Sequence, residues 1–70
     1  ASERFGITPR EYQVLTLLDE GLTDHQIAER LNLSHRTVQT YTGSIAQKLG
    51  ASTRVSIVRA AHQAGIMGHR

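Results

Sequence analysis

Residues 23–41 read TDHQIAERLNLSHRTVQTY, and the architecture of the chain follows from this segment. Thr23 and Ser34 are good helix N-cap residues, and each precedes a run with apolar residues three or four positions apart. Only Asn32, Leu33 and Ser34 separate the two predicted helices. A connection this short predicts a steep crossing of the two helices, which is a helix-turn-helix arrangement.

The residues of the turn suit such a crossing. Ala28 is small enough to let the two helices approach closely. Asn32 tolerates the left-handed backbone conformation that the turn needs. Leu33 is expected to fill the corner between the helices.

Capping signals place two more helices around this pair. Thr8-Pro9-Arg10-Glu11 is a capping box with proline at the first helical position, and Thr23-Asp24-His25-Gln26 repeats the box. Gly21, Gly50 and Gly65 lie where a positive φ ends a helix. The sequence therefore predicts an all-α fold of four helices, at about residues 9–20, 24–31, 35–49 and 52–64.

Apolar residues recur at helical spacing in all four segments, which predicts amphipathic helices around one core. We expect a single domain over residues 1–70, with its core within 7–66 and the helix-turn-helix at about 24–43. The expected core residues are Val14, Leu15, Leu18, Ile27, Ala28, Leu31, Val38, Tyr41, Ile45, Leu49, Ile57, Val58 and Ala61.

Composition narrows the classes of function. The 70 residues include no cysteine, which excludes thiol catalysis and thiolate zinc sites and fits a cytoplasmic location. No apolar run approaches the roughly 18 residues that span a bilayer, so no membrane contact is expected. A net charge of +2 and an isoelectric point of about 9.7 favour an acidic partner such as nucleic acid. The absence of an initiator methionine predicts a piece of a larger protein.

Metal binding and catalysis have little support. The four histidines, His25, His35, His62 and His69, match no familiar spacing of metal ligands. No nucleophile motif or glycine-rich phosphate loop occurs, and the chain is too short to enclose a substantial pocket. We expect no enzyme activity, no cofactor and no metal.

The predicted helix 35–49 has a polar side that carries the functional hypothesis. With Val38 and Ile45 facing inward, the opposite face holds Arg36, Thr40, Gly43 and Gln47, with Gln39 and Ser44 on its flanks. Small and hydrogen-bonding groups without acids suit the major groove of DNA. The alternative is an ordinary solvated helix face; the short turn with Ala28 favours DNA.

Taken in order, these motifs resemble the LuxR/GerE-type DNA-binding domain over about residues 7–66. The matching positions are Ile7 to Glu11, Gly21 to Ala28, Leu31 to Ser34, Thr37, Val38, Ile45, Lys48, Leu49 and Arg54.

The resemblance implies a four-helix output domain of a bacterial transcriptional regulator, whose third helix enters the major groove of double-stranded DNA. By family position, Gln39, Thr40 and Gly43 face bases, while Thr23, Ser34, Thr37, Tyr41 and Lys48 lie near phosphates or in the scaffold. The full set expected to bind DNA is Thr23, Ser34, His35, Arg36, Thr37, Gln39, Thr40, Tyr41, Gly43, Ser44, Gln47 and Lys48.

The sequence departs from the family pattern at three positions. Gln39 replaces a residue that is usually basic, Tyr41 replaces a usual histidine, and Gln26 replaces a usual glutamate. The first two changes affect which bases are read and how tightly, and none of the three is expected to damage the core or the turn.

The family often forms a two-fold dimer through its fourth helix. The outward side of 52–64 carries Ser56, Arg59, Ala60 and Gln63, which are small or polar enough for a self-complementary contact; simple solvation is the alternative. Separately, Glu11 and Arg54 are candidates for an ion pair between the first and last helices, or Arg54 contacts phosphate.

Other interpretations remain open from the sequence alone. A promoter-reading region of a sigma factor has a similar helix-turn-helix, although a fourth helix after Gly50 favours the LuxR type. A helical module that binds a partner protein is the main alternative from another class. RNA polymerase is a further candidate partner, and any upstream receiver, ligand-binding or ATPase domain is undecided.

Overall fold

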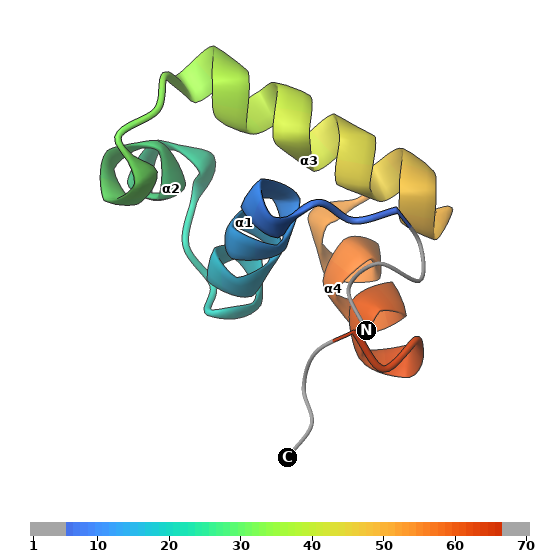
Figure 1. Ribbon diagram of the computed structural model, residues 1–70. Coiled ribbons are helices and arrows are strands. Elements are labelled where there is room, and N and C mark those ends of the chain that lie inside the picture. Colours follow the sequence, from blue (N-terminus) through green and yellow to red (C-terminus); the bar gives the residue numbers. More distant parts are fainter. Residues whose placement is uncertain (1–5, 67–70) are drawn as a thin grey trace.

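The computed structural model describes residues 6–66, which contain four α-helices (Figure 1). They are α1 (Pro9–Asp19), α2 (Asp24–Leu31), α3 (His35–Leu49) and α4 (Arg54–Gln63). The predicted all-α fold is confirmed, and the bounds of α2 and α3 are those predicted. α1 ends one residue earlier than predicted, and α4 is shorter at both ends.

Hydroxyl side chains cap the N-terminus of each of these helices. Thr8, Thr23, Ser34 and Thr53 each accept a hydrogen bond from the backbone N–H three residues later. The sequence predicts the first three caps but not Thr53. The Ser56 hydroxyl accepts hydrogen bonds from the amides of residues 52 and 53 at 3.2 and 2.9 Å, so α4 begins after these two residues.

The turn between α2 and α3 has the predicted conformation. Asn32 has φ 59° and ψ 45°, and it is the one non-glycine residue of 6–66 with a positive φ. This conformation brings the Leu33 N–H to 2.8 Å from the Ala28 carbonyl, which closes the end of α2. At the end of α4, the Ile66 N–H donates in the same way to the Ala61 carbonyl at 3.0 Å, as predicted for Gly65 and Ile66.

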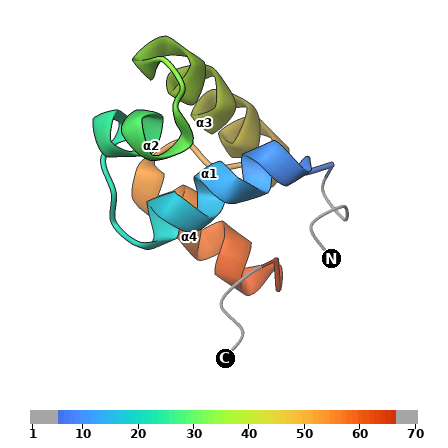
Figure 2. The same cartoon turned by 60° about the vertical axis from the view of Figure 1, so that its left-hand side comes forward.

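α3 packs against α1, α2 and α4 and lies along one border of the molecule (Figures 1 and 2). One side of α3 therefore faces the core and the other has no helix over it. Of the predicted core residues, Leu31, Tyr41, Leu49 and Val58 are only partly buried. The buried hydrophobic residues are Ile7, Val14, Leu15, Leu17, Leu18, Ile27, Ala28, Val38, Ile45, Ile57, Ala61 and Ile66.

Candidate nucleic-acid interface

The outward side of α3 is polar and has no acidic side chain. Val38 and Ile45 are fully buried on the inward side of the helix. Within residues 6–66 no carboxylate pairs with the guanidinium of Arg36, so its charge is available to an external anion. The exposed residues of this face are Arg36, Gln39, Thr40, Gly43 and Gln47, as the helical spacing predicts.

The N-terminal ends of α2 and α3 carry further polar groups. The Ser34 hydroxyl donates to the Thr37 hydroxyl at 2.8 Å and accepts from the Thr37 N–H at 3.1 Å. Thr23 accepts from the Gln26 N–H at 3.2 Å. The exposed imidazole of His35 lies near that of His25, with ring centroids 6.4 Å apart. Hydroxyl and imidazole groups at two helix N-termini suit contact with phosphate.

Ser44 and Lys48 have partners inside the protein. The Ser44 hydroxyl donates to Glu11 Oε2 at 2.7 Å, and Lys48 Nζ donates to Glu11 Oε1 at 2.6 Å. Lys48 Nζ also donates to the Gly6 carbonyl at 2.6 Å. Both side chains therefore connect α3 to the start of α1. The four-residue spacing of 44 and 48 places them on one side of α3, which is the sequence signal for this shared partner.

Glu11 is the buried charge at the centre of this network. It is 5% exposed and also accepts from the Thr8 N–H at 2.9 Å. Burial alone raises the pKa of a carboxyl group, but the hydrogen bonds from Lys48, Thr8 and Ser44, together with the Lys48 charge, outweigh burial. They lower the pKa of Glu11 from 4.5 to about 2. The carboxylate is therefore ionised at neutral pH and fixes α3 relative to α1.

The predicted ion pair between Glu11 and Arg54 is wrong. Arg54 pairs instead with Asp24, with Nη2 2.7 Å from Oδ1, and its Nη1 donates to the Leu22 carbonyl at 3.3 Å. Arg54 is the first residue of α4 and reaches the N-terminus of α2. The Glu11 carboxylate is already paired with the Lys48 ammonium group.

Tyr41 belongs partly to the scaffold. It is half-buried and packs against the hydrophobic core, so the structure places it at the edge of the outward face of α3. From the sequence, Tyr41 is expected both in the core and at the DNA, and its half-buried position is compatible with each.

The outer side of α4 includes a residue that sequence reasoning missed. Arg59 and Gln63 are exposed, whereas Ser56 and Ala60 are half-buried. Val55 is 71% exposed, which is unusual for a large apolar side chain. Its position one turn before Arg59 is the signal that could have identified it.

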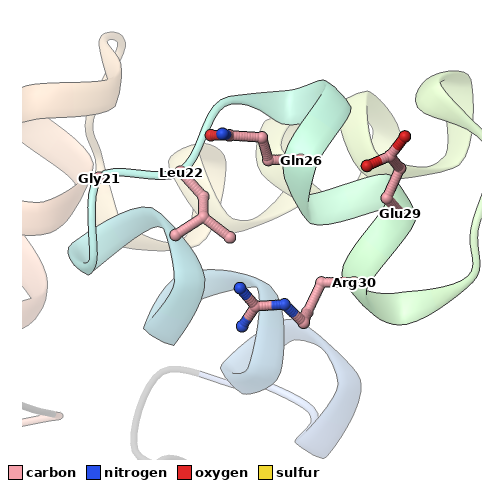
Figure 3. A pocket seen from close by; sticks show the side chains of 5 residues that line it. All are labelled: Gly21, Leu22, Gln26, Glu29 and Arg30. Carbon is pink, nitrogen blue, oxygen red and sulfur yellow. The ribbon is translucent and has the colours of Figure 1, made fainter.

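Two hollows in the surface lie away from the outward face of α3. One is lined by Gly21 and Leu22, which precede α2, and by the polar α2 residues Gln26, Glu29 and Arg30 (Figure 3). The other lies between α1 and α2, lined by Tyr12, Gln13, Thr16, Leu17, Arg30 and Leu31.

Across residues 6–66 no three His, Asp or Glu side chains are grouped to hold a metal ion, and His69 lies outside that range. The same part of the chain has no helix with the length and hydropathy needed to cross a membrane.

Comparison with known proteins gives a family match over most of the chain. The model of the bacterial regulatory proteins of the luxR family, GerE, matches residues 6–61. An HTH-type transcriptional regulator of Mycobacterium bovis is 44% identical over 59 residues, which cover 84% of this chain and 7% of the relative. The response regulator RamR of Streptomyces coelicolor is 42% identical over 59 residues, covering 84% of this chain and 29% of RamR.

A solved structure agrees with these relatives. The crystal structure of the response regulator ChrA of a heme-sensing two-component system has a TM-score of 0.86 and 34% identity. The match covers 89% of this chain and 31% of ChrA. The chain thus spans less than a third of the length of each of these proteins.

Proposed function

This chain belongs to the luxR family of bacterial regulatory proteins, and we propose that it binds a specific sequence of double-stranded DNA with α3 in the major groove. The observation that carries the proposal is the outward face of α3, which is exposed, free of acids and includes Arg36, with which no carboxylate of residues 6–66 pairs. Its short polar side chains allow a close approach to base edges. The chain then acts as the output domain of a transcriptional regulator rather than as an enzyme.

The proposed contacts fall into two groups. Gln39 and Thr40 face base edges, and Gly43 allows the DNA to come close to the helix. The phosphate backbone is contacted by the groups around the two helix N-termini and along the edges of α3. These phosphate contacts are Thr23, Ser34, His35, Arg36, Thr37, Tyr41, Ser44, Gln47 and Lys48.

Lys48 and Ser44 contribute less to this proposed binding than their polarity suggests. Their polar atoms already bond Glu11, so a phosphate contact must be shared with that buried carboxylate. Arg36 has no such competitor within the described residues, and we assign it the largest electrostatic share.

We also propose a homodimer on DNA through the outer side of α4. The expected contact residues Ser56, Arg59, Ala60 and Gln63 follow the exposed Val55 along α4, and Val55 adds an apolar group at the start of this surface. A two-fold dimer would place two copies of α3 on half-sites about one helical turn apart. RNA polymerase is a further proposed partner, and a bacterial regulator of this kind works in the cytoplasm, at the chromosomal DNA.

Salt dependence of duplex binding tests the proposal. Because each neutralised phosphate releases counterions, the log–log slope of affinity against salt should be about −0.9 per phosphate contact. Fluorescence anisotropy on a random duplex and on a selected duplex, at several salt concentrations, measures this slope. A flat response, or no binding at micromolar protein, would instead favour a module that binds a partner protein.

A pair of arginine variants locates the contact surface. Arg36→Ala should weaken binding to most sequences and reduce the salt slope by about one. Arg30→Ala removes the same charge from a residue that lines the hollow in Figure 3 rather than the outward face of α3. This control should leave the slope unchanged; equal losses in both variants would contradict the assignment of the face.

A further inference from the structure

The hydroxyl group of Thr40 is turned toward its own helix. Thr40 is exposed on the outward face of α3, and its Oγ1 donates to the Arg36 carbonyl at 3.1 Å. A threonine hydroxyl has one hydrogen, so this bond uses the only donor of the side chain. Thr40 in this rotamer cannot donate to a base acceptor such as guanine O6 or thymine O4.

The hydroxyl and the methyl group on the β-carbon of Thr40 therefore point to different surroundings, the hydroxyl to the helix and the methyl group to the outside. Its oxygen lies against the backbone of the preceding turn, and the same bond fixes the χ1 angle. The γ-methyl group is the branch left for an external contact. Thr40 is counted as a hydrogen-bonding residue from its type alone. With its hydroxyl bonded to the Arg36 carbonyl, it presents mainly its methyl group to the outside.

The helix next to Thr40 is unusually bare. Gly43 lies one turn later, and a β-carbon added there would meet nothing within 4 Å. Ser44, the other residue one turn away, turns its hydroxyl to Glu11. No outward-pointing side chain therefore fills the turn between Thr40 and Gln47 on the outward face, which leaves the helix backbone open to close approach there.

We infer that Thr40 recognises the 5-methyl group of a pyrimidine, that is, of thymine or 5-methylcytosine, with Gly43 making room for that base edge. This inference rests on the proposed function, because it requires α3 to lie in the major groove. Among the unmodified bases only thymine presents a methyl group there, and contact of an apolar atom with it is a means of discrimination. Burying one methyl group should change the affinity about fourfold.

The test compares thymine with deoxyuridine, which differs by that methyl group alone. A preferred duplex is first obtained by selection from a random pool with the 70-residue chain. Each thymine is then replaced singly by deoxyuridine, and affinity is measured by anisotropy. We expect about a fourfold loss at one position of each half-site. At that position 5-methylcytosine should bind more tightly than cytosine by a similar factor.

Three variants assign the effect to the methyl group of Thr40. Thr40→Ser removes the methyl and keeps the hydroxyl, so the preference for thymine over deoxyuridine should disappear. Thr40→Val keeps a methyl and removes the hydroxyl, so the preference should persist. Thr16→Ser is the matched control, because the Thr16 hydroxyl makes the same kind of bond to the Tyr12 carbonyl in α1, at 2.8 Å.

The outcomes separate this inference from the proposed function. Duplex binding without any deoxyuridine effect, or an effect that survives in Thr40→Ser, overturns the inference and leaves the proposed function standing. Affinity lost in Thr40→Val without a deoxyuridine effect shows instead that the oxygen accepts from adenine or cytosine. Absence of duplex binding rejects the proposed function and the inference with it.

Discussion

Glu11 links the start of α1 to α3 by accepting from the Thr8 N–H, Ser44 and Lys48, and its ionisation is coupled to folding. Its pKa is lowered from 4.5 to about 2 in the folded chain. Because the folded pKa is the lower one, the carboxylate stabilises the fold fully above about pH 4.5. This stabilisation is lost as the pH falls from there through about 2.

We expect Glu11→Gln to lower the free energy of unfolding by about 3 kcal/mol at pH 7, since a fall in the Glu11 pKa from 4.5 to about 2 is worth about that much. The variant should also lose less stability than the parent between pH 4.5 and 2. Urea unfolding followed by circular dichroism at several pH values measures both effects. Glu20→Gln removes an exposed carboxylate and is the control; parallel pH curves for the parent and Glu11→Gln would contradict the assignment.

At Gly43, the stability of α3 and the binding of DNA are expected to favour different residues. It lies inside α3 without a positive φ, and an added β-carbon would meet no atom. Gly43→Ala should therefore raise the free energy of unfolding by about 1 kcal/mol through helix propensity. If α3 lies against base edges, the same variant should bind the selected duplex more weakly.

Denaturant unfolding and anisotropy on the same protein sample measure these two effects. Gly50→Ala is the contrasting variant, because the φ of 68° at Gly50 makes alanine strained there, so stability should fall. A Gly43→Ala protein that is more stable and binds DNA as tightly as the parent would place the base edges elsewhere.

At the scale of the helices, the sequence could predict what depends on near neighbours. The caps at Thr8, Thr23 and Ser34 and the left-handed Asn32 follow from residues within one turn, and the structure confirms them. Thr53 was not predicted, because Ser56 stands where a capping box usually has glutamate or glutamine and the polar Ser52 before it cannot form a hydrophobic staple. The partners of Glu11 and Arg54 could not be predicted, since they depend on how whole helices cross.

The same limit applies to the candidate interface. Helical spacing was enough to predict that Arg36, Gln39 and Gln47 are exposed. It could not show that Ser44 and Lys48 bond a buried carboxylate, or that the Thr40 hydroxyl bonds its own helix. Those orientations depend on rotamers and on α1, and they change which groups are free to meet DNA.

The Thr53 cap gives a prediction for α4 as an element. Its side chain accepts from the Ser56 N–H at 3.1 Å, so Thr53→Ala should lower the free energy of unfolding by about 1 kcal/mol. Ser52→Ala keeps the backbone amide that donates to Ser56 and should have a much smaller effect. Chemical denaturation of the two variants makes the comparison, and equal losses would show that the Thr53 hydroxyl has no special part in starting α4.

At the scale of the whole molecule, an ion pair and a hydrogen bond between side chains hold α4 against the other helices. Arg54 bonds Asp24 at the start of α2, and His62 Nε2 lies 2.6 Å from Asp19 Oδ1 at the end of α1. α1 and α2 both pack against α3, so the outer side of α4 has a fixed position relative to the outward face of α3. A dimer through α4 would therefore set the distance between two copies of α3.

A substitution at Val55 tests whether a dimer through α4 positions the two copies of α3. Because Val55 is 71% exposed, its substitution should not disturb the core. In a two-fold contact near the axis, Val55→Asp places like charges opposite each other. We expect at least about a tenfold loss of affinity on a duplex with two half-sites. Affinity for a single half-site, which needs no dimer, should be unchanged and serves as the internal control. Equal losses on both duplexes would mean that Val55 acts through the fold or contacts DNA directly, and unchanged binding to both would place the dimer contact outside this part of α4.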